Sequence, residues 1–562
     1  MAVATYAIGV DFGTEACRAI VVDLSDGNEV GVVSLAYPHG VVDDLFPEDG
    51  SKLPRDWAIQ YPSDYLTVLE HCVQGVLVQA EIDPASVISL GLDATACTLI
   101  PVDAHDTALA DLAPYASNPH AYAKLWKDHS SQPQASRINA AALERGEKFV
   151  DYYGGKISSE WVLAKTLKLA EEAPEIFAAA ERIYECGDWL VSTLVGEETR
   201  SAAVAGYKAS YQAEIGGYPT ADFLEGLFPG FADVLGKLGW DFLVPGQRAG
   251  GLTAQWAQRL GLPPGIAVGA SNMDAQVAML GAGISKPGEM LLVMGTSVCN
   301  LMLADEREFV PGVAGLVSDG IVPGYWAYET GQAGVGDTFG WYVRNMVPAE
   351  YVERANAESK SVYELLEEMA ARMQPGESGV MALDWFNGNR ATLMDSHLSG
   401  LLVGMTLQTK PEHIYRALIE GSAFGQRIIV EAFRDAGVPV TRLVACGGLA
   451  SRAPLLIQTL ADVLGMEIEV SRSEQTPALG AALHGALAAG SAEGGFAYFG
   501  DASRIASPIA VTYAPNKSRV KQFDELFALY RRLYEQFGNE ERAMMHSLRA
   551  HASQVSNNKT KE

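Results

Sequence analysis

Hydrophobic positions along this chain fall into short uninterrupted runs, separated by longer stretches in which apolar residues recur every three or four positions. The short runs at 87–92 and 443–446 predict buried strands, since continuous apolar runs of this length are typical of strands covered on both faces. The longer stretches predict helices, over 62–80, 158–180, 274–280 and from 518 to about 550. Alternating strands and helices indicate an α/β architecture.

Near the N-terminus, an apolar run ends at Asp11, a Gly13-Thr14 turn follows, and a second apolar run continues to Asp23. This pattern predicts a β-hairpin. The N–H groups of the turn and the Thr14 hydroxyl can converge on a phosphate, with Arg18 adding positive charge nearby. Asp11, at the strand end, can reach the hydrated Mg²⁺ that accompanies ATP. Taken alone, such a motif is more often only a turn.

The hairpin pattern recurs at 291–299, where a strand leads into Gly295-Thr296-Ser297 and a second strand. One constant offset relates the two copies: Gly13 to Gly295, Thr14 to Thr296, Cys17 to Cys299 and Asp23 to Asp305. Because Asp11 falls opposite Val293, the acid that would face a metal is present only in the first copy. The recurrence predicts a duplicated architecture that clamps a triphosphate from both sides.

The length of 562 residues predicts more than one domain, and the 48% hydrophobic content is that of a globular protein. A net charge of −28 disfavours nucleic acid and anionic membrane as partners, since both require basic patches. An anionic ligand must therefore be held by local dipoles, a metal and a few well-placed cations.

The six cysteines form no CxxC pair and have no zinc-ligand spacing, which indicates reduced thiols. We find no signal peptide and no apolar stretch of membrane-spanning length, so a cytoplasmic location is expected. Glycines at 281–283 suit a hinge and set the predicted boundaries: domains at 1–283 and 284–495, then a helical extension at 496–562 whose polar end, from Ser553, is expected to fray.

Three places in the first half carry candidate chemistry. Residues 93–96 follow a buried strand, where ligands meet open α/β sheets, although a plain connecting loop is the commoner case. Lys208 lies in a predicted mixed loop at 206–211 and could point into a cleft, although a lone lysine is usually a solvated charge. Asn272 or Asp274 could cap the helix that follows, or Asp274 could act as a general base.

In the second half, a glycine-rich turn is predicted at 328–337, and the start of the following helix, at Gly336, could hold phosphate. The strand at 443–446 stops at Gly447-Gly448, where the backbone can approach a flat ligand such as adenine closely. Pro454 fits the first turn of a helix. A small-residue helix from 476 is expected to pack against this glycine loop.

Taken together, these motifs resemble the FGGY family of carbohydrate kinases over nearly the whole chain to about residue 490. The matching segments are 11–14, 273–276, 294–297, 400–420 and 447–451. The resemblance implies two actin-like (ribonuclease H-like) ATPase domains with a cleft between them. It also implies roles: Asp274 as catalytic base, Asp11 for Mg²⁺, the Gly13-Thr14 and Gly295-Thr296-Ser297 turns for phosphate, and Gly447, Gly448 and Ser451 for adenosine.

On the sugar side, segments 93–98, 119–127, 206–209 and 329–332 resemble the L-ribulose-phosphorylating branch of the family. This resemblance implies Lys208, Glu329 and the backbone near Ala96 as substrate contacts. Ser130 stands where many relatives have arginine, so recognition of polyols and xylulose is not carried over. The activity it implies is ATP-dependent phosphorylation of the terminal hydroxyl of L-ribulose.

Two alternatives are left open. One is a sister kinase acting on D-ribulose, xylulose or a pentitol. The other, from a different class, is an actin-like chaperone or sensor ATPase. The apolar helix faces after Ser518 could pack on the body or on a partner, so a homodimer is left open too.

Overall fold

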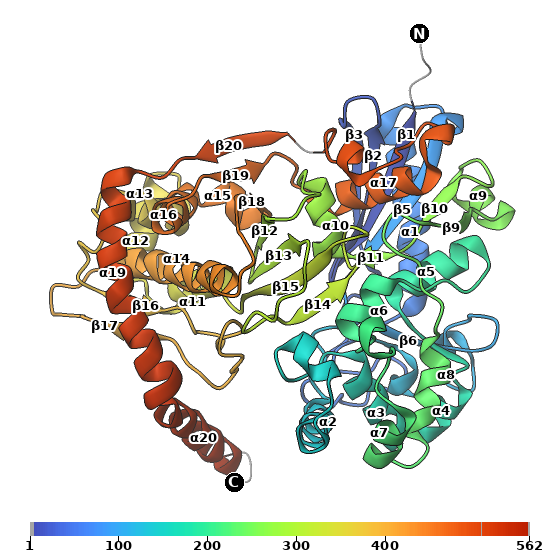
Figure 1. The fold of residues 1–562 in the computed structure, drawn as a ribbon, viewed down its shortest axis with the longest axis horizontal. Helices are drawn as coiled ribbons and strands as arrows, with labels where there is room; N and C mark the ends of the chain where they lie inside the picture. Colours follow the sequence, from blue (N-terminus) through green and yellow to red (C-terminus); the bar gives the residue numbers. More distant parts are fainter. Residues whose placement is uncertain (1–4, 507, 560–562) are drawn as a thin grey trace.

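The computed structural model describes residues 5–506 and 508–559 and contains two α/β domains, each built on a central sheet (Figure 1). In the first sheet, β1, β2 and β3 are antiparallel neighbours, β5 and β10 run parallel to β1, and β9 closes the edge. The short strand β11 also pairs with β5. In spatial order the strands are β3 (Glu29–Ala36), β2 (Ala16–Asp23), β1 (Tyr6–Phe12), β5 (Val87–Ala94), β10 (Ala267–Gly269) and β9 (Arg248–Gly251), with β11 at Asn272–Met273.

The second sheet repeats this arrangement, which confirms the predicted duplication. Its antiparallel strands β12, β13 and β15 correspond to β1, β2 and β3, and its parallel strands β18 and β19 correspond to β5 and β10. In spatial order the strands are β14 (Gly315–Ser318), β15 (Trp326–Gln332), β13 (Val298–Ala304), β12 (Glu289–Met294), β18 (Arg442–Cys446), β19 (Ile468–Ser471) and β20 (Ile509–Tyr513).

The two hairpins differ by one residue in their turns. Phe12 pairs with Cys17 in the first hairpin, whereas Met294 pairs with Val298 in the second. The constant offset therefore holds for the turn residues but not for the strand register, since the second turn closes one residue earlier.

Helix α17 (Thr476–Ala489) belongs late in the chain but lies on β1, β5 and β10 of the first sheet (Figure 1). Close contact is possible because the strands carry glycine there. A Cβ on Gly9 would lie 1.9 Å from the carbonyl oxygen of Ala478. That this helix packs against the 447–451 loop stays a prediction. Its first residue, Thr476, lies beside the Cys446 thiol, at the end of the strand before that loop.

Helix α10 (Asp274–Gly281) crosses in the opposite direction: it follows strands of the first sheet in the chain but packs on the second sheet. Its buried residues Ala278 and Met279 pack with Leu291 and Leu301 of the second sheet. The two crossing helices also pack on each other, and a Cβ on Gly480 would lie 1.9 Å from the carbonyl oxygen of Val277. This helix pair therefore joins the two sheets, next to the glycines where a hinge is predicted.

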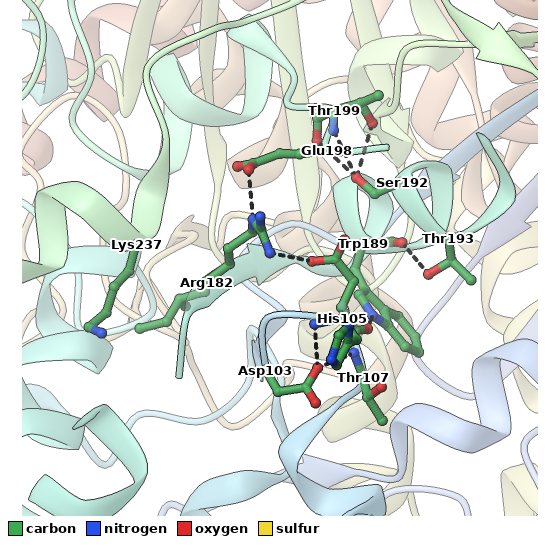
Figure 2. A network of polar contacts seen from close by, with 12 residues as sticks. Asp103, His105, Thr107, Arg182, Trp189, Ser192, Thr193, Glu198, Thr199 and Lys237 are labelled. Carbon is green, nitrogen blue, oxygen red and sulfur yellow. Dashed lines mark hydrogen bonds and ion pairs between the residues drawn. The ribbon is translucent and has the colours of Figure 1, made fainter. Parts of the chain in front are cut away.

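A smaller four-stranded sheet completes the first domain, with strands β4 (Ile59–Gln60), β7 (Ala123–Lys124), β6 (Leu99–Val102) and β8 (Arg182–Glu185). Figure 2 shows how β8 is fastened: the Arg182 guanidinium donates to Glu198 at 2.6 Å and to Asp106 at 3.2 Å. The Trp189 indole N–H, on helix α5, donates to the backbone carbonyl of Asp106. These contacts tie the small sheet to the helix beside the main one.

The predicted helices at 62–80 and 158–180 are confirmed, the second as two helices, and Pro454 lies in the first turn of α16. The remaining principal helices are α1 (Pro62–Ala80), α2 (Gln132–Arg145), α3 (Val162–Glu172), α4 (Pro174–Ala179), α5 (Cys186–Val195), α7 (Ala221–Leu227), α8 (Val234–Leu238), α9 (Ala254–Leu260), α11 (Gly336–Met346), α12 (Ala349–Ala357), α13 (Val362–Ala371), α14 (Pro411–Asp435), α15 (Gly448–Arg452), α16 (Pro454–Leu464) and α18 (Phe499–Ala502).

Two local predictions are wrong. Lys208 does not lie in a loop but ends helix α6 (Ala202–Lys208), which forms because the Ser201 side chain caps its start and its small residues are buried. Glu329 lies on strand β15 and not in a glycine-rich turn, because hydrogen bonding to β13 extends through Gln332.

The C-terminal segment contains α19 (Lys517–Glu535), a π-helical turn (Gln536–Glu540) and α20 (Arg542–Lys559). Phe523, Phe527 and Tyr530 of α19 are buried and contact Phe424 of α14, so this face packs on the body of the protein. The predicted fraying from 553 stays a prediction, and 560–562 lie outside the described residues. The predicted domain boundaries also stay predictions.

All six cysteines are free thiols. Among the helices that the structure describes, none is both long and apolar enough to cross a membrane.

Candidate active site

Three polar residues lie side by side where parallel strands of the first sheet end. The pairing of β1 with β5 places Asp11 opposite Asp93, and the pairing of β11 with β5 places Asn272 beside the same Asp93. Asp274 follows two residues later, as the first residue of α10. The strand-end carboxylates at 11, 93 and 274 therefore form one acidic cluster at an edge of the sheet.

Asp93 is the member of this cluster for which no individual role was predicted, although it begins the candidate segment 93–96. It is fully buried beside the carboxyl of Asp11, and no N–H group among the described residues donates to either of its oxygens. Burial, with the charges of Asp11 and Asp274 added, raises its pKa well above the usual value. The signal in the sequence was its place at the end of a buried strand, but only the β1–β5 register shows that it faces Asp11.

Asp11 forms an ion pair with Arg18 at 3.2 Å, as expected for a hairpin that carries both residues on paired strands. Burial raises the pKa of Asp11, and the Arg18 guanidinium opposes that shift. The cation thus keeps a desolvated carboxyl closer to its charged form.

Asp274 is the carboxyl best suited to accept a proton. Burial raises its pKa to about 7, with a further contribution from the charge of Asp11. Its Oδ1 accepts the N–H of Ala275 at 2.7 Å. The helix-cap alternative is wrong, because Met273 is the N-cap residue of α10 and no side chain caps it.

Lys208 and Glu329 come together from the two domains. The Lys208 Nζ lies 2.9 Å from both carboxylate oxygens of Glu329, and Gln276 Nε2 donates to one of them at 2.8 Å. Lys208 also acts electrostatically on Asp274. Three donated hydrogen bonds leave the carboxylate able to accept about one more. Gln276, for which the sequence analysis proposed no role, couples Glu329 to the helix that begins at Asp274.

Ala96 lies in the turn between β5 and β6, half-buried and packed between two hydrophobic clusters. The neighbouring Thr95 N–H donates to the carbonyl of Phe12 at 3.0 Å. This bond fastens the turn to the end of β1, directly before the first Gly-Thr turn.

The first Gly-Thr turn is held by side chains from elsewhere in the first domain. The Trp126 indole N–H donates to Thr14 Oγ1 at 2.9 Å, Gln60 donates to the Thr14 carbonyl, and Tyr37 donates to the Gly13 carbonyl. Because the Thr14 oxygen accepts from Trp126, its own O–H hydrogen can be directed to a ligand. This bond of Trp126 was not anticipated from the sequence.

In the second turn, Gly295 and Thr296 are exposed and Ser297 is half-buried, and the turn lies against the start of α11. The N–H groups of Val335 and Asp337 donate to the Thr296 carbonyl, and the N–H of Gly336 donates to the Gly295 carbonyl. A Cβ on Gly336 would lie 2.5 Å from that carbonyl oxygen. Gly336 therefore supports the turn with its N–H, and the phosphate role expected of it stays a prediction.

Gly447 and Gly448 follow β18, which pairs with β12 so that this loop lies beside the second Gly-Thr turn. Gly447 has a φ of +91°, and a Cβ there would lie 2.6 Å from the carbonyl oxygen of Met294. Gly448 and Ser451 are exposed on the short helix α15. The strand end is thus kept free of side chains, as close approach of a flat ligand requires.

The residues present fit Mg²⁺. Asp11 and Asp93 are desolvated carboxyls, and the oxygens of Asp93, which accept from no N–H group in the described part of the chain, have spare acceptor capacity. No group of three or more histidine, cysteine, aspartate or glutamate side chains in 5–506 and 508–559 is arranged to hold a metal alone. Mg²⁺ does not need such a cage, because it keeps several waters and is bound through one or two carboxylates and substrate phosphates.

The two sheets share one topology and are joined by crossing helices. Each sheet carries a glycine turn at its strand ends, and the first sheet also carries the carboxylate cluster. This arrangement defines a two-domain ATPase of the actin-like class. Comparison with known families identifies it further. The model of the FGGY carbohydrate kinase N-terminal domain matches residues 6–218, and that of the C-terminal domain matches 290–489. The chain belongs to the FGGY family of carbohydrate kinases, ATP-dependent enzymes that phosphorylate sugars.

Curated relatives align with this chain over nearly the full length of both proteins. The protein named Ribulokinase from Bacillus licheniformis is 48% identical over 529 residues, covering 94% of this chain and 96% of that protein. Ribulokinase from Mycolicibacterium smegmatis is 45% identical and covers 99% and 98%. Xylulose kinase from Rhodospirillum rubrum, a solved structure, has a TM-score of 0.79 at 21% identity, covering 96% of this chain and all of that one. At that identity the structural match concerns the fold alone.

Proposed function

We propose that this protein transfers the γ-phosphoryl group of ATP to the terminal hydroxyl of L-ribulose, giving L-ribulose 5-phosphate. The near full-length relatives named Ribulokinase support this assignment. The observation that carries it is the convergence of Asp274 with the Lys208–Glu329 pair, which brings a proton acceptor together with polar groups suited to a sugar.

In the proposed reaction, Asp274 accepts the proton of the terminal hydroxyl as that oxygen attacks the γ-phosphorus and ADP leaves. Phosphoryl transfer depends mainly on positioning and charge stabilisation, so the base completes its role late. Lys208 donates to sugar oxygens and Glu329 accepts from a sugar hydroxyl. A wrong stereoisomer would leave these buried groups unpaired.

The donors at the ends of both sheets would bind ATP. The N–H groups of the two Gly-Thr turns, the Thr14 hydroxyl and Arg18 are placed to offset phosphate charge. Gly447, Gly448 and Ser451 would lie along adenosine. Mg²⁺, held by Asp11 and Asp93, would neutralise charge on the phosphates.

Turnover on a panel of ketoses and alditols tests this proposal. We expect ADP release to depend on added sugar and L-ribulose to give the highest kcat/KM. Higher kcat/KM with D-ribulose, xylulose or a pentitol would reassign the protein to a sister kinase. ATP hydrolysis independent of every sugar would favour a chaperone or sensor ATPase.

We also propose a cytoplasmic location, which the six free thiols support. Whether the protein forms a homodimer is to be tested by sedimentation, with a single species at twice the chain mass as the positive result.

A further inference from the structure

One face of the C-terminal helices follows the long connection between β16 (Met381–Leu383) and β17 (Leu401–Val403). We call residues 384–400 the β16–β17 connection. Contacts to it recur about every four residues along α19, the π-helical turn and α20. Residues spaced in this way lie on one helix face. The contacting residues are Tyr530, Tyr534, Gly538, Arg542, His546 and Arg549.

The first half of this face binds the start and middle of the connection. The Tyr530 hydroxyl donates to Asp384 Oδ1 at 2.7 Å, and the Tyr534 hydroxyl lies 3.0 Å from Thr392 Oγ1. Gly538 leaves room for the connection, since a Cβ there would lie 2.6 Å from a methyl carbon of Leu393.

The second half of this face binds Asp395, a buried residue that is 5% exposed. Arg542 Nε donates to Asp395 Oδ2 at 2.6 Å, and His546 Nε2 lies 2.7 Å from the same oxygen. The Asp395 Oδ1 accepts the N–H of His397 at 2.8 Å. A buried carboxylate with three such partners fixes the connection to α20.

The opposite side of the connection packs beside strand β15, which carries Glu329. Gly312 packs so closely on it that a Cβ there would lie 2.4 Å from the Thr392 Cα, and the Gly312 carbonyl accepts from Thr330 Oγ1 at 2.9 Å. Thr330 is the neighbour of Glu329. From the first domain, Lys156 donates to the carbonyl of Met394. The connection therefore lies between the C-terminal helices, the strand that carries Glu329 and the first domain.

Arg390 is the basic residue of this connection that acts electrostatically on the site. Its side chain is exposed, and it has no hydrogen bond or ion pair with any residue in the described part of the chain. Burial raises the pKa of Glu329, but Lys208 and, more weakly, Arg390 outweigh burial and hold it below its usual value. Arg390 also acts on Cys299, as Glu329, Lys208 and Asp274 do. An unpaired guanidinium within electrostatic range of Glu329 and Cys299 is free to donate to a ligand.

We propose that Arg390 is a sugar-binding residue and that the C-terminal helices α19 and α20 are the support that positions it. The proposal rests on the proposed sugar kinase function. A guanidinium presents five N–H donors in a planar fork, which suits the carbonyl and hydroxyl oxygens of an open-chain ketose. Arg390 and Lys208 then donate to the sugar while Glu329 accepts from it.

The first test measures steady-state kinetics with L-ribulose and ATP for Arg390→Gln and Arg390→Lys. We expect Arg390→Gln to raise the KM for L-ribulose about 10- to 100-fold, with the KM for ATP unchanged and Arg390→Lys intermediate. Arg55→Gln is the matched control, since the Arg55 side chain is 92% exposed and its ion pair among the described residues is with the neighbouring Asp56. An unchanged KM for L-ribulose, or a rise in the KM for ATP alone, would overturn the sugar contact.

The second test is a double-mutant cycle between Arg390→Gln and Asp395→Asn, which loosens the connection from α20. We expect Asp395→Asn to raise the KM for L-ribulose, and the double variant to be no worse than Arg390→Gln. If the effects of the two substitutions on the KM for L-ribulose simply multiply, or if Asp395→Asn leaves that KM unchanged, the supporting role of α19 and α20 would be overturned. Tyr534→Phe replaces Asp395→Asn in the cycle if that variant does not fold. Failure of the unmodified protein to phosphorylate L-ribulose would refute the proposed function itself, which is a separate result.

Discussion

The ammonium of Lys208 lies 2.9 Å from both carboxylate oxygens of Glu329, joining helix α6 of the first domain to strand β15 of the second. Their side chains are 6% and 17% exposed, so the pair is largely removed from water. Because this contact joins the two domains, the proposed sugar contacts depend on the relative position of the two sheets.

Lys208→Met should leave Glu329 desolvated without its cation. Breaking a buried pair by removing one partner typically costs about 3 kcal/mol in the free energy of unfolding. We expect a lower melting temperature and a loss of roughly 100-fold or more in kcat/KM for L-ribulose. The double variant Lys208→Met/Glu329→Gln should regain stability but not activity. Equal stability of the single and double variants would contradict this account.

Asp274→Asn should remove the proton acceptor while keeping the shape of the site. General-base catalysis contributes about 100- to 10,000-fold, so we expect kcat to fall within that range. ATP binding, measured by calorimetry, should be unchanged, because the proposed nucleotide contacts lie elsewhere. Near-normal sugar-dependent turnover would exclude Asp274 as the base.

The pH profile should report the same carboxyl. Burial and the charge of Asp11 raise the pKa of Asp274 to about 7, and the group accepts a proton only in its ionised form. Sugar kcat/KM should therefore fall about tenfold per pH unit below pH 7 and level off above it. A flat profile between pH 5.5 and 8.5 would argue against this base.

His484 should make the protein sensitive to acid. This histidine of α17 is buried, and neither ring nitrogen has a hydrogen-bond partner within the described residues. Burial lowers its pKa from 6.5 to about 4, so the unfolded chain binds the proton more readily. Its contribution to stability is intact above pH 6.5 and is lost as the pH falls towards 4, by about 3 kcal/mol in total.

His484→Leu should therefore lose less stability than the unmodified protein between pH 7 and pH 4.5 in urea unfolding. His105→Leu, at an exposed position, serves as the control. Parallel stability curves for His484→Leu and the unmodified protein would show that burial of this ring is not the cause.

Gly480→Ala should disrupt the crossing helices. The new Cβ would meet the Val277 carbonyl oxygen at 1.9 Å, and a backbone atom cannot move aside as a side chain does. We expect a loss of about 3 kcal/mol or more in the free energy of unfolding. Gly236→Ala, in helix α8 with open space around it, should be neutral or stabilise by roughly 0.5–1 kcal/mol. Similar melting temperatures for the two variants would refute tight α10–α17 packing.

The repeated hairpins could be predicted from the sequence because a Gly-Thr turn between two apolar runs is a local signal. The same locality explains why residues 208 and 329 were placed in loops. A helix of seven residues capped by Ser201 is too short for a clear periodicity, and β15 is extended by its pairing with β13. Individual roles for Asp93 and Gln276 were missed for a related reason, since each gains its role from a partner distant in sequence.

The sequence by itself determined the α/β class, the duplicated hairpins and the residue types that phosphoryl transfer needs. This was possible because apolar periodicity and glycine turns are local signals that extend over only a few neighbouring positions. Only the tertiary structure decided that α10 and α17 exchange sheets, that Lys208 meets Glu329, and that the C-terminal helices hold the connection carrying Arg390. Those arrangements depend on strand register and on backbones approaching at glycine, which are properties of residues more than a hundred positions apart.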